Sequence, residues 1–176
     1  PEVIHETIAY LEREMCLQIN AEEIAFYSAQ DADSEGIEGK FFLWTTAQLE
    51  EALGMEDALI AAKVFDVSMS GNFIDPHNPE LVHRNILTRR TSISEIAKDL
   101  QIENEELSAK VNLIRARLFE VRKKRIPPDR DEKVLTSWNG LLIGGLAEAG
   151  RVFENQRYIE NAEKTAQFIY RNLWVG

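Results

Sequence analysis

The last third of the chain constrains the fold most, because it holds two long helical patterns separated by a very short connector, 154–157. The first pattern is apolar on nearly every side, which predicts a helix buried on both sides; its apolar positions are Trp138, Leu141, Leu142, Gly145, Leu146, Ala149 and Phe153. The second repeats at helical spacing through Tyr158, Ala162, Ala166, Ile169 and Leu173. So short a connector predicts an antiparallel αα-hairpin. Gly140 and Gly144 predict a flat face that a neighbouring helix can approach closely.

Apolar periodicity predicts five further helices. Their approximate ranges are 2–17, 46–53, 56–66, 93–99 and 104–124. Capping boxes mark two of the starts, at Thr45 with Gln48 and at Ser92 with Glu95. A Pro-Pro pair at 127–128 ends the longest of the five. The fold class is therefore expected to be mainly α.

The residue pattern changes between about residue 25 and about residue 100. Two short aromatic runs, 26–28 and 40–44, flank the acidic, glycine-bearing segment 31–39, which predicts two strands joined by a long turn. The segment 70–88 holds a turn and two prolines and is expected to be mostly loop. We interpret 25–100 as an irregular insertion with a small β-hairpin.

Composition excludes several classes of function. The 176 residues are 44% hydrophobic, which suffices for a real core. The net charge of −10 argues against broad binding to nucleic acid or an anionic membrane. Cys16 is the only cysteine, so no intramolecular disulfide can form, and its apolar neighbours favour a structural over a reactive thiol. No apolar run is long enough to span a bilayer. We expect a cytoplasmic protein.

The sequence also lacks the familiar cofactor signatures. It contains no P-loop, no Gly-rich dinucleotide fingerprint, no Cys-x-x-Cys and no Gly-x-Ser-x-Gly. Its three histidines do not have metal-ligand spacing. We therefore expect neither a cofactor nor a metal site.

The acidic segment 31–39 carries the first candidate site. Residues 31–36 match the start of an EF-hand loop, with oxygen ligands at positions 1, 3 and 5 and glycine at position 6. Position 12 is Phe42, where that loop needs a bidentate Glu, so calcium is the least favoured interpretation. Two others remain: a solvated acidic turn, and a turn whose Asp31, Asp33 and Glu38 face a cleft.

The second candidate site is the segment 131–140. Thr136 or Ser137 can cap the helix that follows, and the first helical turn then offers side chains beside free backbone N–H groups. A Trp can stack on the apolar face of a sugar while Asn and Asp bind hydroxyls, which predicts a polyol-binding rim. The residues alone leave open helix capping combined with a core Trp.

Basic residues gather at the end of the helix predicted over 104–124. They are Arg115, Arg117, Arg122, Lys123, Lys124 and Arg125. Cations at a helix C-terminus complement the helix dipole, and no aromatic residues are interleaved with them as in a nucleic-acid interface. We favour the dipole interpretation.

Several motifs in fixed order resemble one family. They are Phe26-Tyr27-Ser28-Ala29-Gln30-Asp31-Ala32-Asp33-Ser34, Glu38-Gly39-Lys40-Phe41-Phe42-Leu43-Trp44, Gly71-Asn72-Phe73, Asn85-Ile86-Leu87 and the segment 131–141. The chain resembles the thioredoxin-domain-containing family that includes the spermatogenesis-associated thioredoxin-like protein. The resemblance implies a thioredoxin-like domain followed by an (α/α)6 toroid, similar to six-hairpin glycosidases, N-acylglucosamine 2-epimerase and cellobiose epimerase. Glu132 departs from the family, which more often has Asp there.

The resemblance covers only the middle of the toroid. The thioredoxin-like domain and the family's His-Phe-Glu-Lys-Met motif are absent from the chain. Twelve helices of about 11–12 residues with connections of about 4–6 need roughly 180–215 residues, and about four of the seven predicted helices fit the ring. We therefore expect residues 1–176 to be a fragment of a single toroid domain. Its expected partners are the remainder of the toroid and, through exposed apolar faces, other copies of itself.

The resemblance gives a pocket rather than a reaction, since the family has no settled activity. One hypothesis is a carbohydrate-active enzyme of the sugar isomerase, epimerase or glycoside hydrolase type, with activity in the whole protein and none in the fragment. Its acid/base candidates are Asp31, Asp33 and Glu38, and its expected contacts to a carbohydrate or small polyol are Lys40, Trp44, Asn72, Asp131, Lys133, Trp138 and Asn139. The alternative is a non-catalytic scaffold or partner-binding module with a degenerate pocket.

Overall fold

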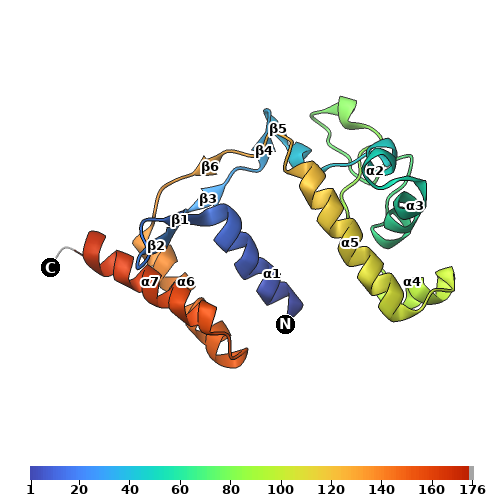
Figure 1. Ribbon diagram of the computed structural model, residues 1–176. Helices are drawn as coiled ribbons and strands as arrows, with labels where there is room; N and C mark the ends of the chain where they lie inside the picture. Colours follow the sequence, from blue (N-terminus) through green and yellow to red (C-terminus); the bar gives the residue numbers. More distant parts are fainter. Residues whose placement is uncertain (175–176) are drawn as a thin grey trace. The chain divides into compact units, whose positions relative to one another are not determined.

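A computed structural model describes residues 1–174, apart from the side chain of Glu80. The described residues form seven α-helices and six short strands (Figure 1), which confirms a mainly helical class with little β structure. They divide into two compact units. We call Pro1–Asp31 with Arg130–Gly176 the terminal unit, and Ala32–Asp129 the central unit. Each is described by itself.

The terminal unit combines three helices with two small antiparallel sheets. In chain order its elements are α1 (Glu2–Tyr10), a π-helical turn (Leu11–Met15), β1 (Cys16–Gln18), β2 (Ile24–Phe26), β3 (Ala29–Gln30), β6 (Arg130–Asp131), α6 (Thr136–Val152) and α7 (Gln156–Asn172). β1 pairs with β2, with Cys16 opposite Phe26, and β3 pairs with β6, with Ala29 opposite Asp131. The core lies between α1, β2, α6 and α7.

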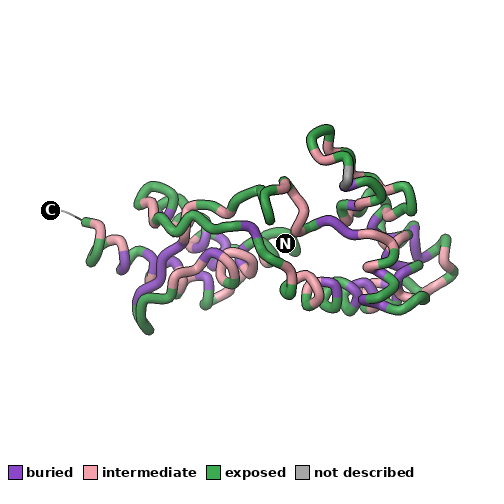
Figure 2. The backbone as a smooth tube through the Cα atoms, turned by 90° about the horizontal axis from the view of Figure 1, so that it is seen from above, coloured by how far each residue is buried: buried purple, intermediate pink, exposed green. Residues whose placement is uncertain are grey.

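The central unit packs four helices around a larger apolar core. Its elements are β4 (Asp33–Ser34), β5 (Ile37–Glu38), a 3-10 turn (Lys40–Phe42), α2 (Thr46–Leu53), α3 (Met55–Val64), a 3-10 turn (Pro79–Leu81), α4 (Ile93–Leu100) and α5 (Asn104–Arg122). β4 and β5 form a hairpin, and Trp44 makes a single antiparallel bridge to Asn85. In both units buried positions alternate with exposed ones along the chain (Figure 2), as amphipathic helices require.

Helices with strong local signals form where the sequence predicts them. Both capping boxes are present: Thr45 caps α2 together with Gln48, and Ser92 caps α4 together with Glu95. The predicted αα-hairpin is confirmed by α6 and α7, which pack side by side (Figure 1). The close approach, however, is at Gly150, where an added Cβ would lie 2.4 Å from Ile159 Cδ1, whereas Gly140 and Gly144 face open space.

Two local predictions are wrong. The first helix does not continue to residue 17, because the chain becomes extended at Cys16 and pairs with β2. The run 40–44 is not a strand, because Gly39 turns the chain with a φ of 73° and a 3-10 turn follows. β2 therefore pairs with β1, which the sequence assigned to a helix.

The predicted burial of α6 on both sides is also wrong within this chain. Leu146 is 1% exposed, but Trp138 and Leu141 are 53% and 77% exposed. Apolar periodicity reports which faces can be buried, and not whether a covering neighbour is present. One face of α6 therefore meets the core and another is open.

Two smaller observations concern the thiol and the membrane. Burial, with nearby Glu12, raises the pKa of the half-buried Cys16 thiol, which agrees with a structural thiol. Within residues 1–174, no helix combines the length and apolar character that a membrane crossing requires.

Candidate functional site

Asn139 lies in the first turn of α6 and is buried. Its side-chain carbonyl accepts the Phe26 backbone N–H at 2.8 Å, and its amide donates to the Phe26 carbonyl at 2.9 Å. A neighbouring β-strand would satisfy Phe26 with the same pair of hydrogen bonds. Asn139 therefore completes the free edge of β2 and joins it to α6. We call such a two-bond arrangement an amide clamp.

Two further asparagines form amide clamps in the central unit. Asn72 accepts the Ile86 N–H at 2.8 Å and donates to the Ile86 carbonyl at 3.0 Å. Asn85 is fully buried, accepts the Ser68 N–H at 3.0 Å and donates to the Ser68 carbonyl at 3.1 Å. Buried backbone groups need such partners. The clamps thus hold segments that regular secondary structure leaves unpaired.

The segment before α6 keeps its charged side chains exposed. Lys133 Nζ lies 3.0 Å from Asp131 Oδ2, and the Lys133 backbone N–H donates to Asp131 Oδ1 at 3.2 Å. Hydrogen bonds from Lys133 hold the pKa of Asp131 below its usual range, so this carboxyl is ionised at neutral pH. The exposed indole of Trp138 follows within the same short segment. An ion pair and an aromatic face are therefore available to a ligand here.

Strand pairing brings β3 to this segment. The Ser28 hydroxyl donates to the Asp131 carbonyl at 3.2 Å, and Ala29 lies opposite Asp131 in the β3–β6 ladder. Asp31 follows β3 and is exposed. Five sequence-predicted residues therefore belong to the terminal unit: Asp31, Asp131, Lys133, Trp138 and Asn139.

The acidic segment contains a tight hairpin. Positive φ values of 56° at Glu35 and 73° at Gly36 are those that a two-residue type I′ hairpin turn requires. Asp33 lies opposite Glu38 in the register, so two exposed carboxylates project from facing positions. Among the described residues, no group of three or more His, Cys, Asp or Glu side chains is arranged to hold a metal ion.

Lys40 and Trp44 lie in the same unit as this hairpin. Lys40 Nζ forms an ion pair with Glu35 at 3.0 Å. Trp44 is 1% exposed, and the Arg125 guanidinium lies 3.9 Å from its ring centroid. The central unit thus holds the other five predicted residues: Asp33, Glu38, Lys40, Trp44 and Asn72.

Sequence reasoning missed two residues that organise the central unit. Asn85 forms a clamp, and Arg125 donates to the carbonyls of Phe41 and Leu43 at 2.9 and 2.7 Å. The signal for Asn85 was its place at the start of the Asn-Ile-Leu motif. Arg125 carried no such signal, because its partners are distant in sequence and are backbone atoms.

Known proteins resemble this chain over most of its length. It is 32% identical over 97% of its length to the uncharacterized protein B0495.5 of Caenorhabditis elegans, of which it covers 25%. It is 31% identical over 85% of its length to spermatogenesis-associated protein 20 of Homo sapiens and 32% identical to that of Rattus norvegicus, covering 21% of each. The chain thus spans a quarter or less of these relatives. No protein-family model matches it. The chain is therefore homologous to one stretch of spermatogenesis-associated protein 20, in agreement with its motifs.

Proposed function

We propose that this chain forms part of an (α/α)6 toroid in a longer protein, and that Asp131, Lys133 and Trp138 bind a carbohydrate or small polyol. We call these three residues the α6 rim. The observation that carries the proposal is the exposed Trp138 indole, which follows an exposed ion pair. An indole offers a flat apolar face to a sugar ring, while a carboxylate and an ammonium group hydrogen-bond its hydroxyls.

The clamp at Asn139 gives the rim a rigid base. Asn139 directly follows Trp138 in the chain, and its amide fixes the first turn of α6 to the backbone of Phe26. A binding group on a rigid element loses less conformational entropy when a ligand binds. In this proposal Asn139 positions the rim, and Asn72 likewise positions loop backbone.

The exposed face of α6 supports the proposal that this chain is part of a toroid. Trp138, Leu141, Gly145 and Val152 fall at steps of three, four and seven, which places them on one stripe, and all four are exposed. Ring helices of an (α/α)6 toroid pack against neighbours on both sides. In the longer protein, we expect further ring helices to pack against this stripe and bury it.

Catalysis would be a property of the whole protein, of the sugar isomerase, epimerase or glycoside hydrolase type. Such chemistry uses two carboxyl groups flanking the reacting bond. Asp33 and Glu38 offer a pair at facing positions of one hairpin, and Asp31 is the third candidate acid or base.

The test is sugar binding and turnover by the full-length protein across a panel of mono- and disaccharides. We expect Trp138→Ala to weaken binding about tenfold or more, because it removes the aromatic face that stacks on the sugar ring. The matched control is Trp174→Ala, since Trp174 is also exposed but lies after α7. Asp33→Asn tests turnover. Absence of saturable binding to every sugar, or equal losses in both Trp variants, would defeat the proposal.

A second candidate is a non-catalytic scaffold or partner-binding module. It is favoured by the amide clamps, which use three motif asparagines, Asn72, Asn85 and Asn139, to hold backbone. In that case Trp138→Ala alters assembly with a protein partner and leaves sugar binding absent. Measuring both properties on the same variant separates the two functions.

A further inference from the structure

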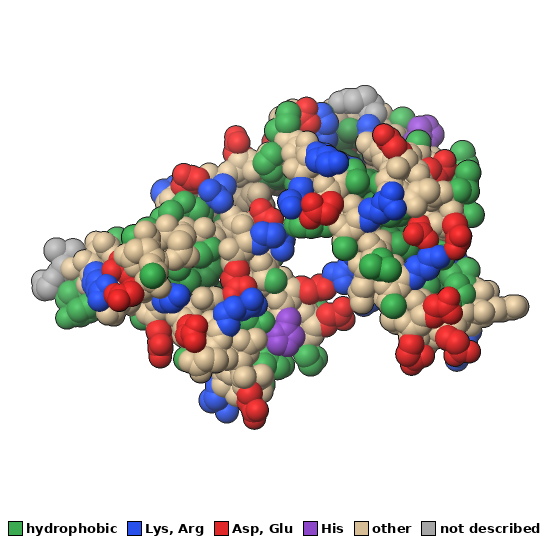
Figure 3. Space-filling view, viewed as in Figure 1, with side chains coloured by type: hydrophobic (Ala, Val, Ile, Leu, Met, Phe, Trp, Pro, Cys, Tyr) green, Lys and Arg blue, Asp and Glu red, His purple; other side chains and the backbone are tan. Residues whose placement is uncertain are grey.

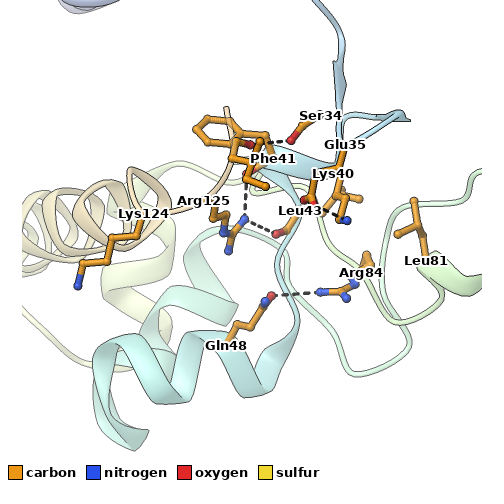
Figure 4. Close-up of a pocket in the computed structure, with 11 residues that line it drawn as sticks. Ser34, Glu35, Lys40, Phe41, Leu43, Gln48, Leu81, Arg84, Lys124 and Arg125 are labelled. Carbon is orange, nitrogen blue, oxygen red and sulfur yellow. Dashed lines mark hydrogen bonds and ion pairs between the residues drawn. The ribbon is translucent and has the colours of Figure 1, made fainter. Parts of the chain in front are cut away.

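The central unit contains a pocket of about 360 Å³ between its N-terminal hairpin, the loop before α4 and the end of α5 (Figure 4). This volume falls within the range of small-molecule sites. Its charged lining side chains are Glu35, Lys40, Arg84, Lys124 and Arg125. The lining therefore contains four cations and one carboxylate, in a chain whose net charge is −10. Acidic and basic side chains are otherwise interspersed over the visible surface (Figure 3).

Arg125 is held rigidly at the pocket wall. Its Nη1 donates to the carbonyls of Phe41 and Leu43 (Figure 4). Its guanidinium also stacks on the buried ring of Trp44. Burial, followed by the charges of Arg122 and Arg84, lowers the pKa of Arg125. The site is therefore partly desolvated and carries repulsion between like charges.

No carboxylate of the described chain relieves that repulsion at two key cations. Among the side chains that the structure describes, Arg84 hydrogen-bonds to Gln48, from Nη1 to Oε1 at 3.3 Å, and the bonds of Arg125 go to backbone carbonyls. Glu35, the one acidic lining residue, is paired with Lys40. Lys124 stands at the edge, pointing away from the other labelled side chains in Figure 4. Cations that no described carboxylate neutralises, in a partly desolvated site, stabilise a bound anion.

The dipole of α5 does not explain this arrangement. Arg125 lies beyond the end of α5 at Arg122, where a cation complements the dipole, but Arg84 comes from the loop that follows Leu81 and Lys40 from a 3-10 turn. Three segments distant in sequence therefore bring cations to one pocket. The guanidinium group matches phosphate oxygens with paired N–H donors.

Four apolar residues also line the pocket, and we call them its apolar wall: Phe41, Leu43, Leu81 and Ile126. Such a wall suits an organic body attached to the anion, since small-molecule sites combine apolar walls with a few polar groups.

We propose that this pocket binds the phosphate group of a small organic phosphate ester, with Arg84 and Arg125 as its principal ligands. The inference does not depend on the α6 rim, which belongs to the terminal unit. Inorganic phosphate shares the recognised group and is expected to bind more weakly, because it leaves the apolar wall empty.

The test is titration of the complete chain with butyl phosphate, inorganic phosphate and butanol, monitored by calorimetry and by the NMR resonance of Arg125 Nε–H. We expect saturable binding in the order butyl phosphate, then phosphate, with none for butanol. Arg84→Gln is expected to weaken butyl phosphate binding about tenfold or more, because it removes a charged hydrogen-bond donor to the phosphate. Arg84 makes few structural contacts, so the variant should fold, and circular dichroism checks this.

The matched control is Arg89→Gln, which removes an exposed cation outside the pocket. Unchanged affinity in this variant supports a specific site, whereas equal weakening in both variants would show only non-specific charge attraction. Lack of saturable binding to either phosphate compound by the unmodified chain overturns the proposal. Equal affinity for the two compounds overturns the role of the apolar wall.

Discussion

The two units differ in how they stabilise similar helices. The central unit buries fifteen hydrophobic residues in one cluster that α2 to α5 enclose. The terminal unit buries eight in its cluster, so its stability depends more on polar contacts between distant segments, which both units contain. Examples are His5 Nδ1 with the Tyr158 hydroxyl at 2.7 Å, and Glu23 with Arg171 at 2.7 Å. A helix pair with an open face can therefore be held by directional contacts where apolar burial is limited.

The largest expected effect lies in the central core. Leu107 is fully buried in α5, so Leu107→Ala should lower the free energy of unfolding by about 2–5 kcal/mol. Leu113→Ala, on the exposed side of the same helix, should change it by less than about 0.5 kcal/mol. Urea unfolding monitored by Trp44 fluorescence, with Trp138 and Trp174 replaced by Phe, measures both. Equal effects of the two variants would contradict an enclosed apolar core.

The second effect concerns the terminal unit. Asn139→Ala leaves the N–H and carbonyl of Phe26 without side-chain partners and should cost about 2–4 kcal/mol. Asn155→Ala makes the same chemical change at the N-cap of α7 and should cost about 1 kcal/mol. Thermal and urea unfolding of both variants provide the measurement. A loss no larger than that of Asn155→Ala would mean that the clamp contributes no more to stability than a single N-cap bond.

A third effect is present at neutral pH and disappears in acid. Hydrogen bonds from Arg171 and then Asn172 lower the pKa of Glu23 in the folded state. A lowered folded pKa stabilises the fold above the unfolded value of about 4.3, and this stability disappears as the pH falls through the folded pKa. Glu23→Gln should therefore be less stable than the unmodified chain at pH 7, with the difference shrinking as the pH falls below about 4.3.

Glu22→Gln is the control for that comparison, because Glu22 also contacts Arg171, at 3.3 Å, but is exposed. Its stability should follow the unmodified chain across the pH series. Parallel pH profiles for the unmodified chain and Glu23→Gln would show that the polar contact does not stabilise the terminal unit.

The smallest expected effect on stability is at the open face of α6. Leu141 is 77% exposed, so Leu141→Glu should change the free energy of unfolding of this chain by less than about 0.5 kcal/mol. The same change should reduce self-association in sedimentation velocity, because it places a charge in an apolar stripe. A large loss of stability in this chain would show that the face is already packed. In the full-length protein, the toroid proposal expects that large loss.

Elements with local signals could be predicted from the sequence, and elements that depend on distant partners could not. The capping boxes at Thr45 and Ser92 act within four residues, and the periodicity of α5 lies within one helix. The two hydrogen-bonding partners of β2, in contrast, carry no local signal. One is β1, whose sequence continues a helical apolar pattern, and the other is the Asn139 side chain, 113 residues from Phe26.

The candidate site shows the same division. The residue types that can bind a sugar were recognisable around Trp138, and the structure keeps that indole exposed. The hydrogen bonds of Asn72 and Asn139 to the backbone were not recognisable, because a side-chain amide serves a ligand and a peptide group equally well. The two uses differ only in what the fold places beside the amide.

The clamp at Asn139 also has a consequence for chemical ageing. Asn139 precedes Gly140, and Asn-Gly sequences in flexible chains lose ammonia readily when the following peptide nitrogen attacks the side-chain carbonyl. Here α6 holds that nitrogen in a helix, and the amide is engaged on both sides. Deamidation would replace an N–H donor with an oxygen that faces the Phe26 carbonyl, turning attraction into repulsion. The folded terminal unit is thus expected to protect the Asn139 side-chain amide from deamidation. Deamidated chains should accumulate after unfolding and then refold less readily, because the clamp to Phe26 can no longer form.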